Sequence, residues 1–289
     1  MRVWTQRIKS YFWLTKPGII AGNAVTAAGG YFLVAHGSDA GKQGALLLLG
    51  LSLIVASACV CNNYIDRFID GKMMRTHRRA LVTGEVTLRA ALVLGMSLLL
   101  LGALCLLYFA NLLALSTALL GFALYVFGYS YLKHTSTHST LMGSVAGACP
   151  PVVGYVAAHP HFDGSACVLF LLTALWQMPH FYAIAIYRLQ EYRQAGLPIF
   201  PLKRGLLATK RQMLYYTAVF MGVAPLLFVF GCAGFAYLFC SCFFGLLWLG
   251  LCLLGFVCKD ERRWARHMFF FSLIVILGLS FTMVFNRVM

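Results

Sequence analysis

Three polar side chains recur at intervals of four residues where a long apolar stretch ends. Asn62, Asp66 and Asp70 are spaced i, i+4 and i+8, which places their oxygen atoms on one face of a helix. Two carboxylates and an amide are hard ligands suited to Mg²⁺, which usually completes its shell with water and substrate phosphates. Ionisable groups at the end of an apolar helix are costly and usually functional. A structural interpretation stays open, in which Asp66 and Asp70 are helix-end charges paired with Arg67 or Lys72.

A basic cluster follows this motif directly. It consists of Lys72, Arg75, His77, Arg78 and Arg79. Basic side chains beside a metal–carboxylate site fit a phosphate or diphosphate ligand, and Arg75 and Arg79, four residues apart, are the preferred pair. Each of these residues also fits the ordinary positive charge of a cytoplasmic loop. Together the motif and the cluster favour a lipid diphosphate, whose leaving group the metal and the arginines would neutralise.

A second polar group lies inside another apolar stretch. Gln177 and His180 flank Pro179, which is expected to kink a helix at that point. Polar groups beside a kink are candidate site residues. A single histidine is more often structural, so both interpretations of His180 stay open.

The elements that must position these residues are membrane helices. The chain is 61% hydrophobic and 11% charged, against about 45–50% and about 25% in soluble domains. A span needs about 20 apolar residues. Windows without Asp, Glu, Lys or Arg cover 17–38, 43–65, 90–132, 139–162, 164–187, 212–258 and 267–286. Two are double length, with breaks expected near Asn111 and near 231–234, so the sequence predicts an all-α polytopic membrane protein with nine transmembrane helices.

The basic residues predict the orientation of these helices. With the N-terminus in the cytoplasm, all of the 23 Lys and Arg except Lys42 and Arg287 fall in cytoplasmic segments. This asymmetry favours an N-in, C-out arrangement. The two longest cytoplasmic loops, about 71–87 and 189–210, are where functional residues are expected to concentrate.

Composition excludes several other classes. The net charge of +15 lies in short clusters between apolar runs, so it predicts membrane loops and no nucleic-acid partner. Most of the ten cysteines lie within apolar runs without a metal-type CxxC pair, which indicates packing rather than a disulfide framework. No cleavable signal peptide is expected, since the first sixteen residues carry four basic side chains and no apolar core.

At these motifs the sequence resembles the protohaem IX farnesyltransferase (haem O synthase) family, a branch of the intramembrane prenyltransferases of the ubiquinone-biosynthesis type. The Asn-xxx-Asp-xxx-Asp motif alone marks only the wider superfamily, whereas Trp-Gln-x-Pro-His followed by Tyr-xx-Ala-Gly-x-Pro is much more specific to the haem branch. The matching stretches cover nearly the whole chain: Thr15 to Gly18, Asn62 to Asp70, Met74 to Thr76 with Arg79, Pro150-Pro151 with Gly154-Tyr155, Trp176 to Phe181, and Ala195 to Pro201.

The resemblance implies a fold and a reaction. The whole chain, 1–289, is expected to form a single domain, with nine helices around a central cavity and two active loops on the cytoplasmic side of a bacterial inner membrane. The reaction implied is transfer of a farnesyl group from farnesyl diphosphate to a vinyl group of haem B, with water supplying the hydroxyl of haem O. Haem B is then a substrate and Mg²⁺ the cofactor. The resemblance also raises two further partners: the haem-using terminal oxidases that would take up the product, and a second copy of the chain in a homodimer.

The resemblance also implies residue roles. Asn62, Asp66 and Asp70 would hold Mg²⁺ and diphosphate, and Arg75 and Arg79 would help to neutralise it. The remaining candidates for substrate binding are Lys72, Arg78, Lys133, Gln177, His180, Tyr182, Arg188 and Glu191. Gln177 and His180 are expected to face the haem, where His180 would ligate the iron or orient the porphyrin edge.

The sequence departs from the family pattern at the second loop. The superfamily usually carries a second aspartate-rich motif there, where this chain has Arg188 and Glu191. The haem branch commonly has Asp at the position of Glu191 and Pro at that of Ala80. A second Mg²⁺ site is therefore in doubt.

Three alternatives remain. The first is a prenyltransferase acting on a quinone or aromatic acceptor, which would be expected to carry a fuller second acidic motif. The second is an ion-coupled transporter, although transporter sites gather near the bilayer midplane rather than at its boundary. The third is a haem-binding electron carrier, which would need facing histidine pairs within its spans.

Overall fold

The computed structural model describes residues 2–285, and every regular element within them is helical. Nine helical stretches in this part of the chain are long and apolar enough to cross a membrane, which confirms the predicted number. Arg287, one of the two basic residues expected on the far side, lies outside the described residues.

The spans follow one another in chain order. A short helix α1 (Arg2–Leu14) precedes them. The first three spans are α2 (Pro17–Val34), α3 (Ala40–Asp70) and α5 (Leu88–Phe109). The fourth combines α6 (Leu112–Ala123), a π-helical segment η1 (Leu124–Tyr129) and α7 (Ser130–Thr135), and the fifth combines α8 (Ser139–Gly147) with α9 (Cys149–Ala158).

The last four spans complete the bundle. The sixth is α10 (Gly164–Tyr187), which continues as a helix through Pro179. The seventh is α13 (Leu206–Val223) with α14 (Leu226–Val229), followed by α15 (Phe235–Leu254) and α16 (Glu261–Phe285). Short helices stand in the two long loops: α4 (Ala80–Thr83) in the first, and α11 (Leu189–Gln194) and α12 (Phe200–Arg204) in the second.

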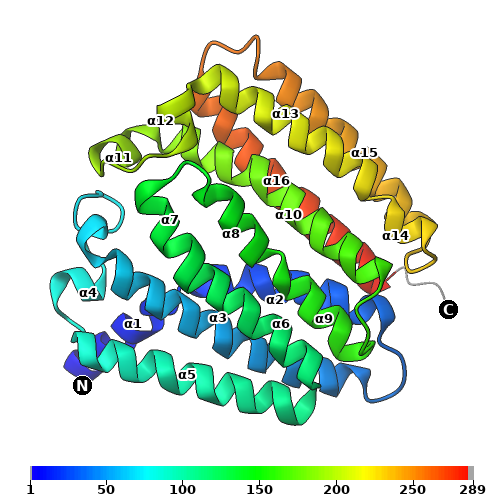
Figure 1. Cartoon of the computed structure of the whole chain (residues 1–289), viewed down its shortest axis with the longest axis horizontal. Helices are drawn as coiled ribbons and strands as arrows, with labels where there is room; N and C mark the ends of the chain where they lie inside the picture. The colour runs from blue at the N-terminus through cyan, green and yellow to red at the C-terminus, as the bar shows by residue number, and fades with distance from the viewer. Residues whose placement is uncertain (1, 286–289) are drawn as a thin grey trace.

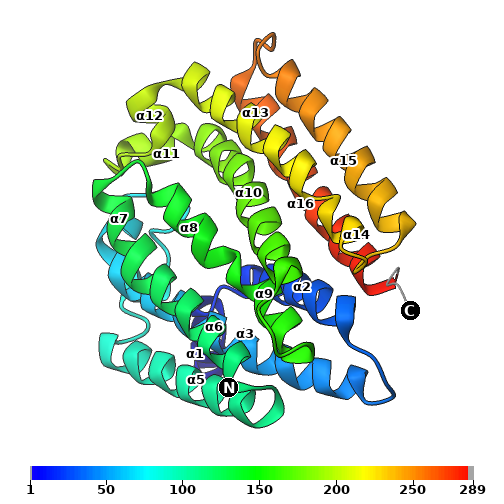
Figure 2. The ribbon, with the colours of Figure 1, turned by 45° about the vertical axis from the view of Figure 1, so that its right-hand side comes forward.

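The spans form an inner and an outer set (Figures 1 and 2). Residues of α2, α3, α6, η1, α8, α9, α10 and α16 line one central cavity, whereas α5, α13 and α15 contribute none of its lining. The outer helices carry many exposed apolar side chains, such as Leu104 on α5 and Phe239 on α15. Such faces fit contact with lipid hydrocarbon.

The two predicted breaks within the double-length windows are confirmed. Asn111 caps α6, because its side-chain oxygen accepts a hydrogen bond from Ala114 N at 2.8 Å. Its amide also donates to Val156 O at 2.8 Å, which ties this turn to the end of α9. The second break lies between α14 and α15, where Gly231 adopts a φ of 74° that favours glycine.

Glycines set the close approach of α2 and α9. A Cβ added to Gly154 would lie 2.0 Å from Ala27 O, and one added to Gly30 would lie 2.0 Å from Pro151 O. Small residues at crossing points let membrane helices pack backbone to backbone. This contact fixes the position of Pro150 and Pro151 beside the cavity wall.

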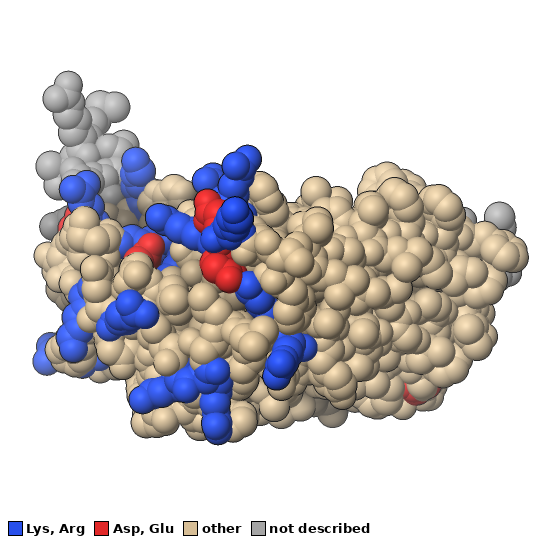
Figure 3. Space-filling model, turned by 90° about the horizontal axis from the view of Figure 1, so that it is seen from above, with Lys and Arg blue, Asp and Glu red and all other residues tan. Residues whose placement is uncertain are grey.

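Charged side chains gather on one part of the face shown in Figure 3. Lys and Arg, with a few acidic groups among them, are spread over the left half of this view, and a broad area at the right carries no basic side chain. A one-sided distribution of this kind agrees with the loop asymmetry in the sequence. The direction in which the chain is inserted stays a prediction.

Candidate active site

The motif Asn62, Asp66 and Asp70, called here the polar row, lies along the last three turns of α3. This helix continues to Asp70, past the apolar window that ends at residue 65, so all three side chains keep the predicted helical spacing. All three are buried, with 2%, 6% and 2% of their surfaces exposed. Buried carboxylates need cationic or hydrogen-bonding partners, since their desolvation is costly.

Each member of the polar row is contacted by a lysine or arginine from a different segment of the chain. Lys16 Nζ donates to Asn62 Oδ1 at 2.5 Å, and Arg79 Nη1 donates to Asp70 Oδ2 at 2.6 Å. Lys133 Nζ donates to Asp66 Oδ2. Three segments that lie far apart in the sequence therefore bring positive charge to one face of α3.

Lys16 holds an unusual backbone conformation at this site. Its φ of 55° makes it the only non-glycine with a positive φ among the described residues. That conformation costs about 1–3 kcal/mol and concentrates at functional sites. Burial lowers the pKa of Lys16 to about 8. Lys16 lies within the matching stretch Thr15 to Gly18 but is not among the site residues predicted from the sequence.

The polar row has the donor chemistry for Mg²⁺. Asp66 Oδ1 is buried and has no hydrogen-bond partner among the described residues, and His134 Nε2 lies 3.7 Å from it. An unpartnered carboxylate oxygen of this kind is available to a cation. Within residues 2–285, no three or more His, Cys, Asp or Glu side chains lie close enough together to hold a metal ion by themselves. Two carboxylates and an amide fit the usual Mg²⁺ arrangement, in which phosphates and water complete the shell.

The two long loops meet beside the polar row. Arg75 Nε lies 3.8 Å from Glu191 Oε2, and Arg188 Nη1 donates to Glu191 Oε1 at 2.9 Å. Met73 in the first loop packs against Ala195 and Leu197 in the second. Glu191 Oε1 thus accepts a hydrogen bond from Arg188, whereas its buried Oε2 has no hydrogen bond among the described residues and is held in ion-pair range of Arg75.

The structure does not bring every predicted residue to this cluster. Lys72 and Arg78 are exposed, and neither has an ion-pair partner among the described residues. Tyr182 is buried with its ring 5.4 Å from that of Phe200, away from the cavity lining. By contrast, Arg75, Lys133 and Arg188 all line the cavity.

The cavity has a volume of about 860 Å³. This lies near the top of the range of about 300–1,000 Å³ for small-molecule sites. Basic side chains, Arg75, Lys133 and Arg188, stand in the same lining as apolar ones such as Leu51 and Ile276. Lys133 connects the cavity to the polar row, because it lines the first and contacts Asp66 in the second.

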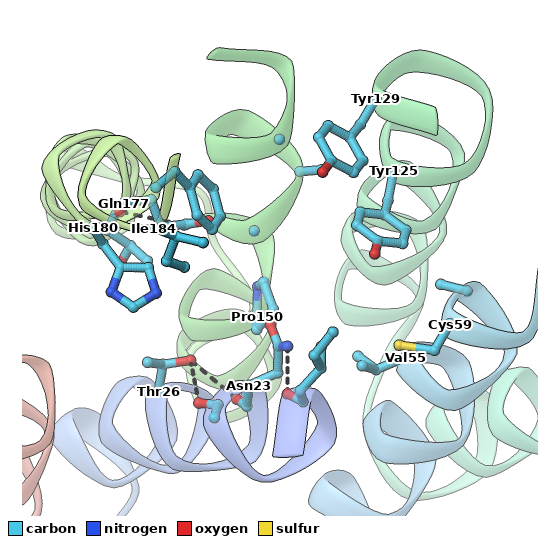
Figure 4. A pocket seen from close by; sticks show the side chains of 18 of the residues that line it. Asn23, Thr26, Val55, Cys59, Tyr125, Tyr129, Pro150, Gln177, His180 and Ile184 are labelled. Carbon is cyan, nitrogen blue, oxygen red and sulfur yellow. Dashed lines mark hydrogen bonds between the residues drawn. The ribbon is translucent and has the colours of Figure 1, made fainter. Parts of the chain in front are cut away.

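Aromatic and polar side chains face each other across the cavity (Figure 4). Tyr125 and Tyr129 extend from η1 with their rings stacked at 5.3 Å and 21°. Gln177 and His180 lie opposite, on α10. Gln177 Nε2 donates to Thr173 O at 3.3 Å and to Ser144 O at 3.4 Å. The two tyrosines were missed in the sequence, since they stand in an apolar window where nothing separates a cavity face from a lipid face.

The site suits an amphiphilic substrate with an anionic end. Charge-assisted hydrogen bonds from Lys16, Arg79 and Lys133 would hold phosphate oxygens next to the polar row. The apolar wall of the cavity would take a hydrocarbon tail, and the electron-rich faces of Tyr125 and Tyr129 would stabilise a cation formed nearby.

Comparison with known proteins agrees with this geometry. The model of the UbiA prenyltransferase family matches residues 23–274. A protein named protoheme IX farnesyltransferase 2, from Chromobacterium violaceum, is 46% identical over 279 residues, 96% of this chain and 92% of that protein. A protoheme IX farnesyltransferase from Protochlamydia amoebophila is 44% identical over 281 residues, 97% of this chain and 99% of its own.

Solved structures share the fold at lower identity. A digeranylgeranylglyceryl phosphate synthase superposes with a TM-score of 0.80 at 17% identity, covering 97% of this chain and 98% of that one. A UbiA homologue from Archaeoglobus fulgidus, bound to GPP and Mg²⁺, gives a TM-score of 0.68 at 16% identity over 95% and 99%. The family match spans residues 23–274, and the two farnesyltransferases each cover at least 96% of the chain. The chain therefore belongs to the UbiA prenyltransferase family, and it is a membrane prenyltransferase.

Proposed function

We propose that this protein transfers the farnesyl group of farnesyl diphosphate to a vinyl group of haem B, with addition of water, to give haem O. The observation that carries the proposal is the identity of 44–46% to proteins named protoheme IX farnesyltransferase over at least 96% of the chain. The geometry supports it, because a cluster of cations and carboxylates stands at the edge of a large apolar cavity. We further propose that residues 1–289 act as one domain.

The polar row and its basic partners would bind the diphosphate. Asn62, Asp66 and Asp70 would hold Mg²⁺, which when bound supplies charge neutralisation for the leaving group. Lys16, Arg79 and Lys133 already direct their donors at these oxygens. On binding, the same three cations would share their hydrogen bonds with phosphate oxygens. Arg75 at the junction of the loops would add a further positive charge.

The chemistry requires a cation and a nucleophile in one enclosed space. The bond between C1 of the farnesyl group and the diphosphate oxygen breaks, and the diphosphate keeps the electron pair. The π electrons of the vinyl group then form the new carbon–carbon bond. Water adds to the resulting porphyrin side-chain cation and loses a proton, which leaves the hydroxyl. Tyr125 and Tyr129 would stabilise the allylic cation with their ring faces.

The acceptor would occupy the cavity between η1 and α10. Its apolar lining suits a porphyrin face, and Arg188 in the same lining is a suitable partner for a propionate group. Gln177 and His180 would contact the ring from α10. We propose a bacterial inner membrane as the location, with the two long loops and the polar row on the cytoplasmic side, and haem-using terminal oxidases as the consumers of the product.

Product analysis tests the acceptor directly. The purified protein in lipid nanodiscs is supplied with Mg²⁺, isotopically labelled farnesyl diphosphate and either haem B or a hydroxybenzoate-type quinone precursor. The proposal expects a labelled haem whose mass rises by one farnesyl group and one hydroxyl. Label that enters the aromatic precursor but not the haem would keep the prenyltransferase activity and overturn the haem acceptor.

A further inference from the structure

Two side chains of α10 contact one serine on α16. Trp176 Nε1 donates to the main-chain oxygen of Ser272 at 2.7 Å, and His180 Nδ1 lies 2.7 Å from Ser272 Oγ. Ser272 is fully buried. The rings of Trp176 and His180 stack at 4.9 Å and 25°. These contacts join residues more than 90 positions apart in the sequence.

The hydroxyl of Ser272 has a second partner that decides the tautomer of His180. Ser272 Oγ donates to Phe269 O at 2.6 Å. A hydroxyl carries one hydrogen, and a carbonyl oxygen can only accept. With that hydrogen directed at Phe269 O, the oxygen of Ser272 is left as an acceptor. The proton in the contact with His180 is then carried by Nδ1 of the imidazole.

The other ring nitrogen of His180 is left with a free lone pair. His180 lines the cavity (Figure 4), and within residues 2–285 its Nε2 forms no hydrogen bond. The ring centroids of Phe181 and Phe269 lie 5.6 Å and 5.0 Å from that of His180. Together with Trp176, these aromatic side chains restrict rotation of the imidazole ring. An imidazole fixed in this way, with Nδ1–H donating and Nε2 free, is arranged as metal-ligating histidines are.

We propose that Ser272 is a positioning residue which holds His180 as its Nδ1–H tautomer, so that Nε2 serves as an axial ligand to the iron of the porphyrin acceptor. The inference rests on the proposed function, because it assigns a contact to that acceptor. A helix rises about 1.5 Å per residue, so Arg188, which directly follows α10, lies about 12 Å beyond His180 along the helix axis. Both residues line the cavity. A porphyrin ligated at His180 would then direct its propionates toward Arg188.

Resonance Raman spectroscopy of the ferrous haem complex tests the ligation. The wild-type protein is expected to show an iron–nitrogen stretching band that shifts when histidine is labelled with heavy nitrogen. His180→Gly is expected to lose this band and to regain one when imidazole is added, since imidazole fits the space left by the side chain. A His180→Gly complex with the wild-type band would overturn the inference.

A second variant tests the positioning role. Ser272→Ala is expected to keep the band at a lower frequency and to bind haem about tenfold more weakly, because the hydrogen bond at Nδ1 raises ligand basicity. Ser280→Ala is the matched control, since Ser280 is a buried serine on the same helix outside the cavity lining. Equal band frequency and haem affinity in Ser272→Ala, Ser280→Ala and the wild type would refute the role of Ser272.

The inference and the proposed function fail in different ways. A wild-type protein that makes haem O while His180→Gly keeps the wild-type Raman band would leave the function standing and remove the ligand. A wild-type protein that binds haem through His180 but transfers no farnesyl group to it would contradict the function instead.

Discussion

Lys16 Nζ lies 2.5 Å from Asn62 Oδ1 and so connects the entry of the first span to the polar row of α3, across 46 positions of sequence. Lys16 adopts a left-handed backbone conformation immediately before Pro17, the first residue of α2. The strained backbone turns a basic side chain inward at a point where the chain enters the membrane. Lys16 is therefore placed to act on the same ligand as Arg79 and Lys133.

Replacement of Lys16 is expected to weaken diphosphate binding. Hydrogen bonds to charged groups contribute about 1.5–3 kcal/mol, so Lys16→Gln should raise the KM for farnesyl diphosphate by roughly tenfold or more. Steady-state kinetics at saturating haem would measure this change. Lys42→Gln is the control, because Lys42 is exposed at the start of α3. Equal KM values for the two variants would remove Lys16 from the site.

Glu191 is expected to join the loops rather than to bind metal. Its two oxygens are directed at Arg188 and Arg75. Both ion pairs are partly exposed, and ion pairs near the surface contribute about 0–1 kcal/mol, so Glu191→Gln should change turnover by less than about fivefold. The Mg²⁺ concentration for half-maximal rate should stay unchanged. A clear rise in that concentration would instead indicate a second metal site at this loop.

The number of spans could be predicted because windows without charge are long and the basic clusters between them are dense. The breaks at Asn111 and at 231–234 were also predictable, since a capping side chain and glycines interrupt otherwise uniform apolar runs. The polar row was predictable from spacing alone, because α3 continues as a helix to Asp70.

The partners of these residues could not be predicted in the same way. Tyr125, Tyr129 and Ser272 stand in windows that are apolar on every side, so periodicity does not separate the cavity face from the lipid face. The contact of His180 with Ser272 depends on the crossing of α10 and α16, which no local pattern encodes. The conformation of Lys16 likewise appears only in the folded chain.

The crossing of α2 and α9 is expected to tolerate no added methyl group at Gly154. A Cβ there would meet Ala27 O at 2.0 Å, and backbone atoms cannot move aside as side chains do. Overpacking of this kind costs about 1–3 kcal/mol or more, so Gly154→Ala should lower the midpoint of thermal unfolding in detergent. Gly222→Ala should not, because nothing lies within 4 Å of its added Cβ. A Gly154→Ala protein as stable as Gly222→Ala would contradict this packing.

The insertion of the chain can be measured with reporter fusions. An N-in arrangement places the end of α16 outside the cytoplasm and the loop between α15 and α16 inside. Alkaline phosphatase fused after α16 should be active, and green fluorescent protein fused after residue 258 should fluoresce. The opposite pattern at both points would reverse the orientation and place the polar row on the outer side.

Farnesyl transfer by Asp66→Asn is the decisive test of the proposed metal and diphosphate site. Asp66 is buried, contacts Lys133 and carries an unpartnered oxygen that suits a cation. Neutralisation of a leaving group by a bound metal contributes several kcal/mol, so turnover should fall by more than about 100-fold, while haem binding stays as in the wild type. Asp39→Asn, at an exposed position before α3, should keep full activity. An Asp66→Asn enzyme that transfers farnesyl groups within tenfold of the wild-type rate at the same Mg²⁺ concentration would contradict the proposed site.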